Sequence, residues 1–138
     1  MERTSPPFRA DHVGSLLRPS WLIEARKAFN AGQLSHEELR KQEDRAVRDV
    51  VAMQEESGLR SITDGEFRRL NYLTEFLNPI GVELHQQKSE DLVYHDDHGG
   101  TVPATKAVVN RRIVWKSSIN VDAFNFLKSI TRGTAKVT

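Results

Sequence analysis

A helix and strand near the middle of the sequence constrain the fold most strongly. Ser35 is followed three residues later by Glu38, a capping box that begins a helix predicted over His36 to Ser57. Apolar side chains recur at helical spacing along it, namely Leu39, Ala46, Val50 and Met53, with Val47 and Val51 beside them. Gly58 ends the helix, and Leu59 to Thr63 fits a strand buried between helices. This pair predicts a sheet that is covered by helices.

The same alternation continues on both sides of this pair. In chain order we predict a strand over Phe8 to Val13, a helix over Trp21 to Asn30 capped by Ser20, a helix or helical turn over Phe67 to Leu77, a helix capped by Asn120 or Asp122 that runs to Ile130, and a strand over Ala135 to Thr138. Strands that alternate with helices favour a parallel sheet with helices packed outside it. The fold class predicted is therefore α/β.

The stretch from Ile80 to Trp115 interrupts this rhythm. Glycines and Pro103 separate short alternating runs there, of which Ala107 to Trp115 is one. Such runs are typical of β-hairpins. We interpret residues 1–138 as part of one domain, with an inserted hairpin or two over about residues 80–116.

Composition excludes several classes of function. The 138 residues carry 20 Lys and Arg against 19 Asp and Glu, so the net charge of +1 gives no field that would hold nucleic acid. The sequence has no cysteine, which excludes disulfides, thiolate zinc sites and a cysteine nucleophile within it. No apolar stretch approaches the roughly 18 residues that span a membrane. The first seven residues lack the apolar core of a secretory signal, so we expect a cytoplasmic location.

Two polar clusters lie where predicted strands end. They are His12-Val13-Gly14-Ser15 and Asp64-Gly65-Glu66. Barrel enzymes carry their chemistry on the loops that follow the carboxyl ends of strands. A carboxylate such as Glu66 is a good partner for an ammonium group, and a hydroxyl or backbone N–H can receive a carboxylate. The two clusters therefore occupy the places where a barrel enzyme would carry its site.

Structural interpretations stand beside these functional ones. Gly14-Ser15 fits a simple turn before a helix, and His12 fits a structural histidine. Glu66 fits a first-turn carboxylate of the following helix, or a partner of Arg68 or Arg69. Asp64 is favoured as the N-cap of that helix. Three histidines with two aspartates among them, His85, His95, Asp96, Asp97 and His98, belong to a polar loop, and we do not expect a metal site there.

Asp11 to Pro19 and Ile62 to Arg69, about fifty residues apart with helices between them, resemble the opening of the catalytic barrel of the cobalamin-independent methionine synthase family, in its single-barrel branch. The resemblance runs over essentially the whole chain. It implies a partial (β/α)8 TIM barrel, made of the first two strand-helix units with a β-hairpin insertion. A complete barrel needs roughly 250 residues, so the chain is expected to be an amino-terminal fragment of one.

The resemblance also implies a function and a set of residues. The family transfers a methyl group from a methyltetrahydrofolate-type donor to the thiol of homocysteine, which zinc activates. Val13 and Ser15 match positions that contact the substrate amino acid, Glu66 matches the carboxylate that holds its ammonium group, and His12 would line the pocket. The family's zinc ligands are His, Cys, Glu and Cys on later strands, and none can be assigned here. We therefore expect the chain alone to be inactive, as a truncated copy of an enzyme.

Two further functions fit the sequence. Relatives of the family act on other thiols, including coenzyme M, so the acceptor need not be homocysteine. Alternatively, the chain is a non-catalytic half-barrel that needs a partner chain, because an unclosed sheet leaves an unpaired edge that favours association.

Overall fold

The computed structural model describes residues 11–69, 74–80, 82, 87–95, 97–106, 109 and 112–138. They form two compact units. The first contains the described residues up to Arg68 together with those from Asn120 onward, and the second contains the described residues between them. Within this described part of the chain, no helix is both long enough and apolar enough to cross a membrane.

The helix α2, His36–Glu56, organises the first unit. Its capping box is confirmed, because the Ser35 hydroxyl accepts from the Glu38 N–H and the Glu38 carboxylate accepts from the Ser35 N–H at 2.8 Å. The apolar stripe is buried as predicted over most of its length, although Met53 is exposed. The preceding helix α1, Ser20–Asn30, packs on α2. Ser20 does not cap it: Pro19 precedes the helix and no side-chain cap bond forms.

These two helix starts offer a matched test of capping. Ser35→Ala is expected to lower the free energy of unfolding by about 1 kcal/mol, because it removes the acceptor for an otherwise unpaired N–H. Ser20→Ala, also at an exposed helix start, should change it by less than about 0.5 kcal/mol. Urea denaturation measures both variants. Equal losses would show that the capping box contributes nothing specific.

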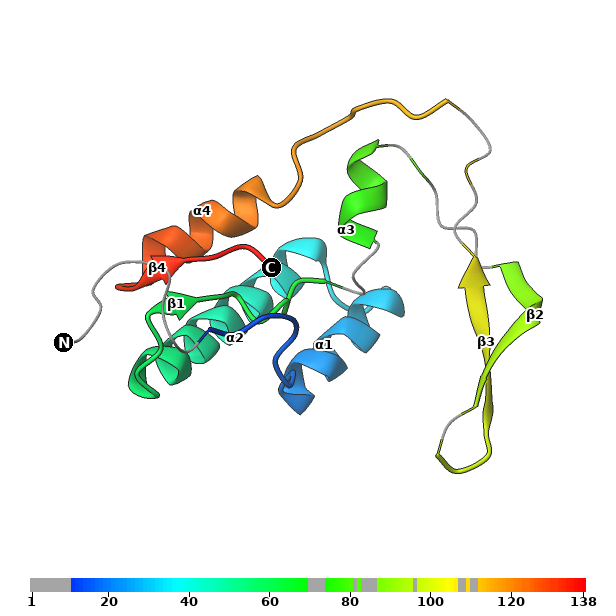
Figure 1. Cartoon of the computed structure of the whole chain (residues 1–138), viewed down its shortest axis with the longest axis horizontal. Coiled ribbons are helices and arrows are strands. Elements are labelled where there is room, and N and C mark those ends of the chain that lie inside the picture. Colours follow the sequence, from blue (N-terminus) through cyan, green and yellow to red (C-terminus); the bar gives the residue numbers. More distant parts are fainter. Residues whose placement is uncertain are drawn as a thin grey trace. The chain divides into compact units, whose positions relative to one another are not determined.

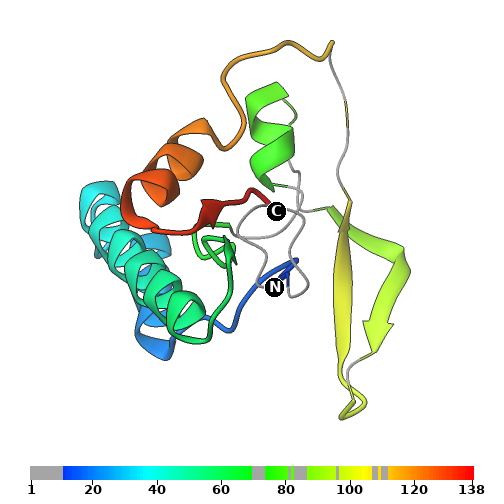
Figure 2. The same cartoon turned by 60° about the vertical axis from the view of Figure 1, so that its left-hand side comes forward.

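The sheet of the first unit has two parallel strands. Strand β1, Ser61–Ile62, pairs with β4, Thr134–Ala135, which follows the helix α4, Val121–Ile130. Thr134 N donates to Arg60 O and Lys136 N donates to Ile62 O, each at 2.9 Å. Figure 1 shows β1 and β4 side by side with α2 running along β1, and Figure 2 shows the same group from the turned view.

One apolar core joins the three helices to this strand pair. It consists of Leu22, Ala46, Val47, Val50, Val51, Ile62, Phe67 and Leu127. α1 and α4 each contribute a single leucine that is almost fully buried, while α2 contributes a row of small side chains. Because Ala and Val are short, α1, β1 and α4 can all pack closely on α2.

Two predicted elements differ from the structure where it describes them. Residues 11–13 of the predicted strand Phe8 to Val13 form no strand, and its earlier residues lie outside the described part. The predicted helix or helical turn over Phe67 to Leu77 does not begin as a helix at Phe67, because residues 65–68 form a turn that includes Glu66 at a φ of +57°. Residues 70–73 lie outside the description, and helix α3 spans only Thr74–Leu77.

The second unit contains the predicted hairpin. β2, Gln87–His95, pairs antiparallel with β3, Thr101–Lys106, with an irregularity between Lys88 and Val93. A short 3-10 helix, Asn78–Ile80, follows α3. A hairpin is therefore present where one was predicted, but Ala107 to Trp115 is not one of its strands where the structure describes that run. The backbone there donates to Pro79 and Ile80 carbonyls instead, from Lys116 and Val114.

Candidate functional site

The carboxyl ends of β1 and β4 meet at one edge of the parallel pair. Thr63 to Glu66 follows β1, and Lys136 to Thr138 follows β4. The first motif joins this edge, because Leu16 N donates to Gly65 O at 3.1 Å. The two motifs that the sequence singled out are therefore hydrogen-bonded neighbours, and a third segment lies beside them.

The turn after β1 has a conformation that its residues explain. Gly65 and Glu66 both adopt left-handed φ, +65° and +57°. A Cβ on Gly65 would lie 3.2 Å from the Phe67 ring and 3.3 Å from Leu16 Cβ, so these neighbours would have to shift by a few tenths of an ångström to admit a side chain. The Asp64 carboxylate accepts from Glu66 N at 2.9 Å. Asp64 therefore stabilises a turn, and its predicted role as a helix N-cap is wrong.

Glu66 is fixed from two sides. Its carbonyl accepts from the Arg18 guanidinium at 2.9 Å, and its carboxylate accepts from the Thr138 hydroxyl at 3.3 Å. The interpretation of Glu66 as a first-turn carboxylate is wrong, because no helix begins here. Arg68, offered as its ionic partner, lies 2.7 Å from the Asp44 carboxylate and stacks on Phe126.

The other predicted binding residues lie on the first motif. Val13 is 74% exposed, Ser15 is exposed and His12 is half-buried. A ring nitrogen of His12 lies 2.8 Å from Gly14 O, which holds the imidazole against its own segment. The segment is therefore ordered by local contacts, with Val13 and Ser15 at the surface.

Lys136 ties this segment to β4, and sequence reasoning missed it. Its ammonium donates to the Asp11 carboxylate at 2.7 Å and to His12 O at 3.0 Å. The contact with Lys136 holds the pKa of the Asp11 carboxyl below its ordinary value. Thr138 was also missed. Both lie where parallel strands end at one edge, which was the available signal, but they were interpreted as part of a strand.

A buried ionic cluster lies behind the turn. Arg26 pairs with Glu43 at 3.0 Å and donates to the Phe67 carbonyl, while Arg68 pairs with Asp44. Burial raises the pKa of the Glu43 carboxyl, although Arg26 and Arg68 oppose this shift. Burial has the opposite effect on a cation, and it lowers the pKa of the Arg18 guanidinium. Arg26 on α1 thus bonds to the backbone of the turn, and Arg68, at the end of the turn, is held by Asp44 on α2.

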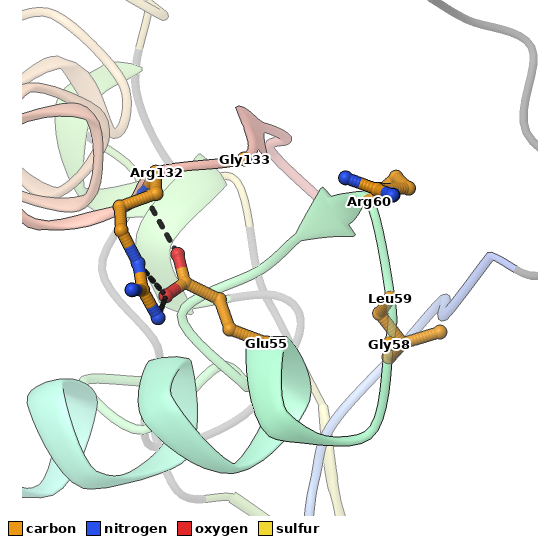
Figure 3. A pocket seen from close by; sticks show the side chains of 6 residues that line it. All are labelled: Glu55, Gly58, Leu59, Arg60, Arg132 and Gly133. Atoms are coloured by element: carbon orange, nitrogen blue, oxygen red, sulfur yellow. Dashed lines mark hydrogen bonds and ion pairs between the residues drawn. The ribbon is translucent and has the colours of Figure 1, made fainter. Parts of the chain in front are cut away.

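A pocket of about 330 Å³ lies at the opposite, amino-terminal end of the two strands. It is lined by Glu55, Gly58, Leu59, Arg60, Arg132 and Gly133. The Glu55 carboxylate accepts from the Arg132 N–H at 2.7 Å (Figure 3). It also accepts from the Thr131 hydroxyl at 2.9 Å. These bonds hold the pKa of Glu55 below its ordinary value of 4.5. The contacts join α2 to the loop before β4, which is a structural role.

Glu55 should make the free energy of unfolding depend on pH. The pKa of the Glu55 carboxyl is lower in the folded state than in the unfolded state. Its contribution to the free energy of unfolding is therefore fully present above the unfolded-state pKa, and it is lost as the pH falls through the folded-state pKa. Glu55→Gln is expected to be less stable than wild type at about pH 7, and the gap should narrow below about pH 4. Urea denaturation at the two pH values measures this. A gap that does not change with pH would contradict the assignment.

The histidines between residues 80 and 116 do not form a metal site where the structure describes them. His95 and His98 are exposed in the second unit, and His85 lies outside the described residues. Among the residues that the structure describes, no group of three or more His, Asp or Glu side chains is placed to hold a metal ion.

The chain is similar in sequence to uncharacterized bacterial proteins and to archaeal methionine synthases. No protein-family model matches the chain. The uncharacterized Bacillus subtilis protein YxjG is 45% identical over 84 residues, which cover 60% of this chain and 22% of that protein. A methionine synthase of Sulfolobus acidocaldarius is 30% identical over 122 residues, 86% of this chain and 33% of the relative. One from Sulfurisphaera tokodaii is 32% identical, with the same coverage.

A solved structure extends the match to nearly the whole chain. It is a candidate vitamin-B12 independent methionine synthase from Listeria monocytogenes, with a TM-score of 0.68 and 32% identity. The alignment covers 96% of this chain and 36% of that one. The chain thus spans between about a fifth and a third of the curated relatives' length. The α/β arrangement described above is the arrangement of part of that structure.

Proposed function

Because this chain belongs, over most of its length, to the cobalamin-independent methionine synthase family, we propose that it carries the amino-acid-binding half of that family's substrate site. In a full-length protein this half would serve methyl transfer from a methyltetrahydrofolate-type donor to the thiol of homocysteine. The observation that carries the proposal is the bond from Leu16 N to Gly65 O, which brings the two motifs together. The wider fold would be a (β/α)8 barrel, of which this chain is an early part.

Each proposed binding residue has a distinct task. The Glu66 carboxylate, which accepts from the Thr138 hydroxyl while Arg18 donates to the Glu66 backbone carbonyl, would bind the substrate ammonium group. Val13 and Ser15 would contact the rest of the amino acid through backbone and hydroxyl, and His12 would line the same side. Because Gly65 has no Cβ, the two segments lie close enough to share one small ligand.

Zinc does not fit the residues of this chain. The family's thiolate ligands require cysteine, and the sequence has none. The described residues also offer no three-membered ligand group. We therefore assign no metal-dependent step to this chain and expect no methyl transfer by it alone.

Isothermal titration calorimetry with L-methionine tests the proposal. One molecule should bind per chain, and 3-(methylthio)propionate, which lacks the ammonium group, should not bind detectably. Coenzyme M also lacks an ammonium group, so binding of coenzyme M in preference to methionine would favour the alternative acceptor. Absence of methionine binding, or one zinc per purified chain with methyl transfer, would contradict the proposal.

The first unit also supports a second candidate, a half-barrel that pairs with another chain. Leu17 is 95% exposed, and Val13 and Val137 are also exposed large apolar side chains of this unit. Among the described residues β1 and β4 pair only with each other, and the edge of β4 that faces away from β1 could pair with another polypeptide. Sedimentation analysis tests this: a stable monomer that unfolds cooperatively at all concentrations would contradict it.

A further inference from the structure

Gln54 is a polar side chain on the apolar face of α2. It is 1% exposed, and it follows Val50 by four residues and Val47 by seven. A buried amide is costly unless it is fully hydrogen-bonded. Its amide nitrogen donates to Thr63 O at 2.8 Å and to Val50 O at 3.0 Å, and its oxygen accepts from Thr63 N at 3.0 Å. The side chain thus binds both backbone groups of the residue that follows β1.

The two hydrogen bonds from Gln54 to Thr63 take the place of those that a neighbouring strand would form. Ile62 O accepts from Lys136 N on the side of β4. The N–H of the same trans peptide belongs to Thr63 and points the opposite way. A side-chain amide, rather than a neighbouring strand, meets Thr63 on that flank. Gln54 therefore sets where the chain leaves β1.

A hydrogen-bonded chain continues from Gln54 to the candidate site. The Thr63 hydroxyl, which is fully buried, lies 3.5 Å from the Gln54 oxygen and accepts from Gly65 N at 3.1 Å. Gly65 O in turn accepts from Leu16 N. Each link orients the next, so the position of the first motif beside Glu66 depends on a side chain of α2.

We propose that Gln54 is a positioning residue for the amino-acid site: through Thr63 it fixes the Gly65-Glu66 turn and the attachment of the first motif to that turn. The proposal rests on the proposed function for its consequence in binding, but its geometric part can be tested separately. Gln54 touches no ligand itself and acts through the backbone that holds Glu66.

Amide hydrogen exchange in the full chain tests the geometric part. Gln54→Leu removes both bonds to Thr63 while keeping the volume similar. The exchange rates of the Gly65 and Leu16 amides, each divided by that of the helical Val51 amide, should rise at least about tenfold. Gln54→Glu keeps an acceptor for Thr63 N but loses the donor to Thr63 O, so it should give a smaller rise and serves if Gln54→Leu does not fold.

Val47→Ala is the matched control, because Val47 is equally buried on the same helix and its side chain makes no hydrogen bond. Its loss of stability should raise all three rates together and leave the ratios within about twofold. Unchanged ratios in both Gln54 variants would overturn the proposal. L-methionine binding should weaken about tenfold in Gln54→Leu and not in Val47→Ala. If wild type does not bind methionine, the proposed function fails, while the exchange ratios still decide the role of Gln54.

Discussion

Replacing Glu66 by glutamine is expected to weaken the binding of L-methionine by about ten- to a hundredfold. A hydrogen bond to a charged group contributes about 1.5–3 kcal/mol, and each 1.4 kcal/mol is a factor of ten in affinity. Glutamine keeps the size of the side chain and an oxygen acceptor for the Thr138 hydroxyl. The loss would therefore report the negative charge that faces the ligand ammonium. Calorimetric titration of both proteins measures it.

The matched control is Glu37→Gln, which removes the same charge from the exposed first turn of α2. It should leave the affinity within about twofold, because exposed charges are screened. Equal affinities for wild type and Glu66→Gln would contradict the assignment of Glu66. An equal loss in both variants would point to long-range electrostatics instead of a direct contact.

Truncating Leu22 should have the largest effect on stability. Leu22 is fully buried where α1 meets α2, and Leu22→Ala is expected to lower the free energy of unfolding by about 3 kcal/mol, through lost burial and a residual cavity. Leu17→Ala removes the same atoms from a side chain that is 95% exposed, and should change stability by less than about 0.5 kcal/mol. Chemical denaturation measures both. Similar losses in the two variants would contradict the described core.

The elements that were predicted correctly are those with local causes. The α2 helix begins at its capping box and buries its apolar stripe, because both features depend on residues within a few positions of one another. Likewise, the hairpin formed within the predicted insertion, where glycines such as Gly99 allow positive φ.

The errors have tertiary causes. Phe67 to Leu77 has a helical pattern, yet residues 65–68 form a turn, after which the Phe67 carbonyl accepts from Arg26 and Arg68 pairs with Asp44. Residues 11–13 are held by Lys136, about 125 positions away, and not by a strand partner. No spacing rule could link these segments.

The sequence indicated the candidate binding residues, but it did not indicate the residues that hold them in position. Glu66 and the first motif came from resemblance to a family, and their roles in binding stay a prediction. Lys136, Thr138 and Gln54 emerged only from the three-dimensional contacts. Gln54 had left one sign in the sequence, an amide at an apolar position of α2, which marks a side chain that must find buried partners.

A nuclear magnetic resonance titration of the ¹⁵N-labelled chain with L-methionine tests the central claim most directly. Binding at the carboxyl ends of β1 and β4 should shift the amide signals of Val13, Ser15, Gly65 and Glu66, with saturation at one ligand per chain. Shifts confined to Gly58, Arg60 and Arg132, at the opposite end of the strands, or no shifts at all, would contradict it.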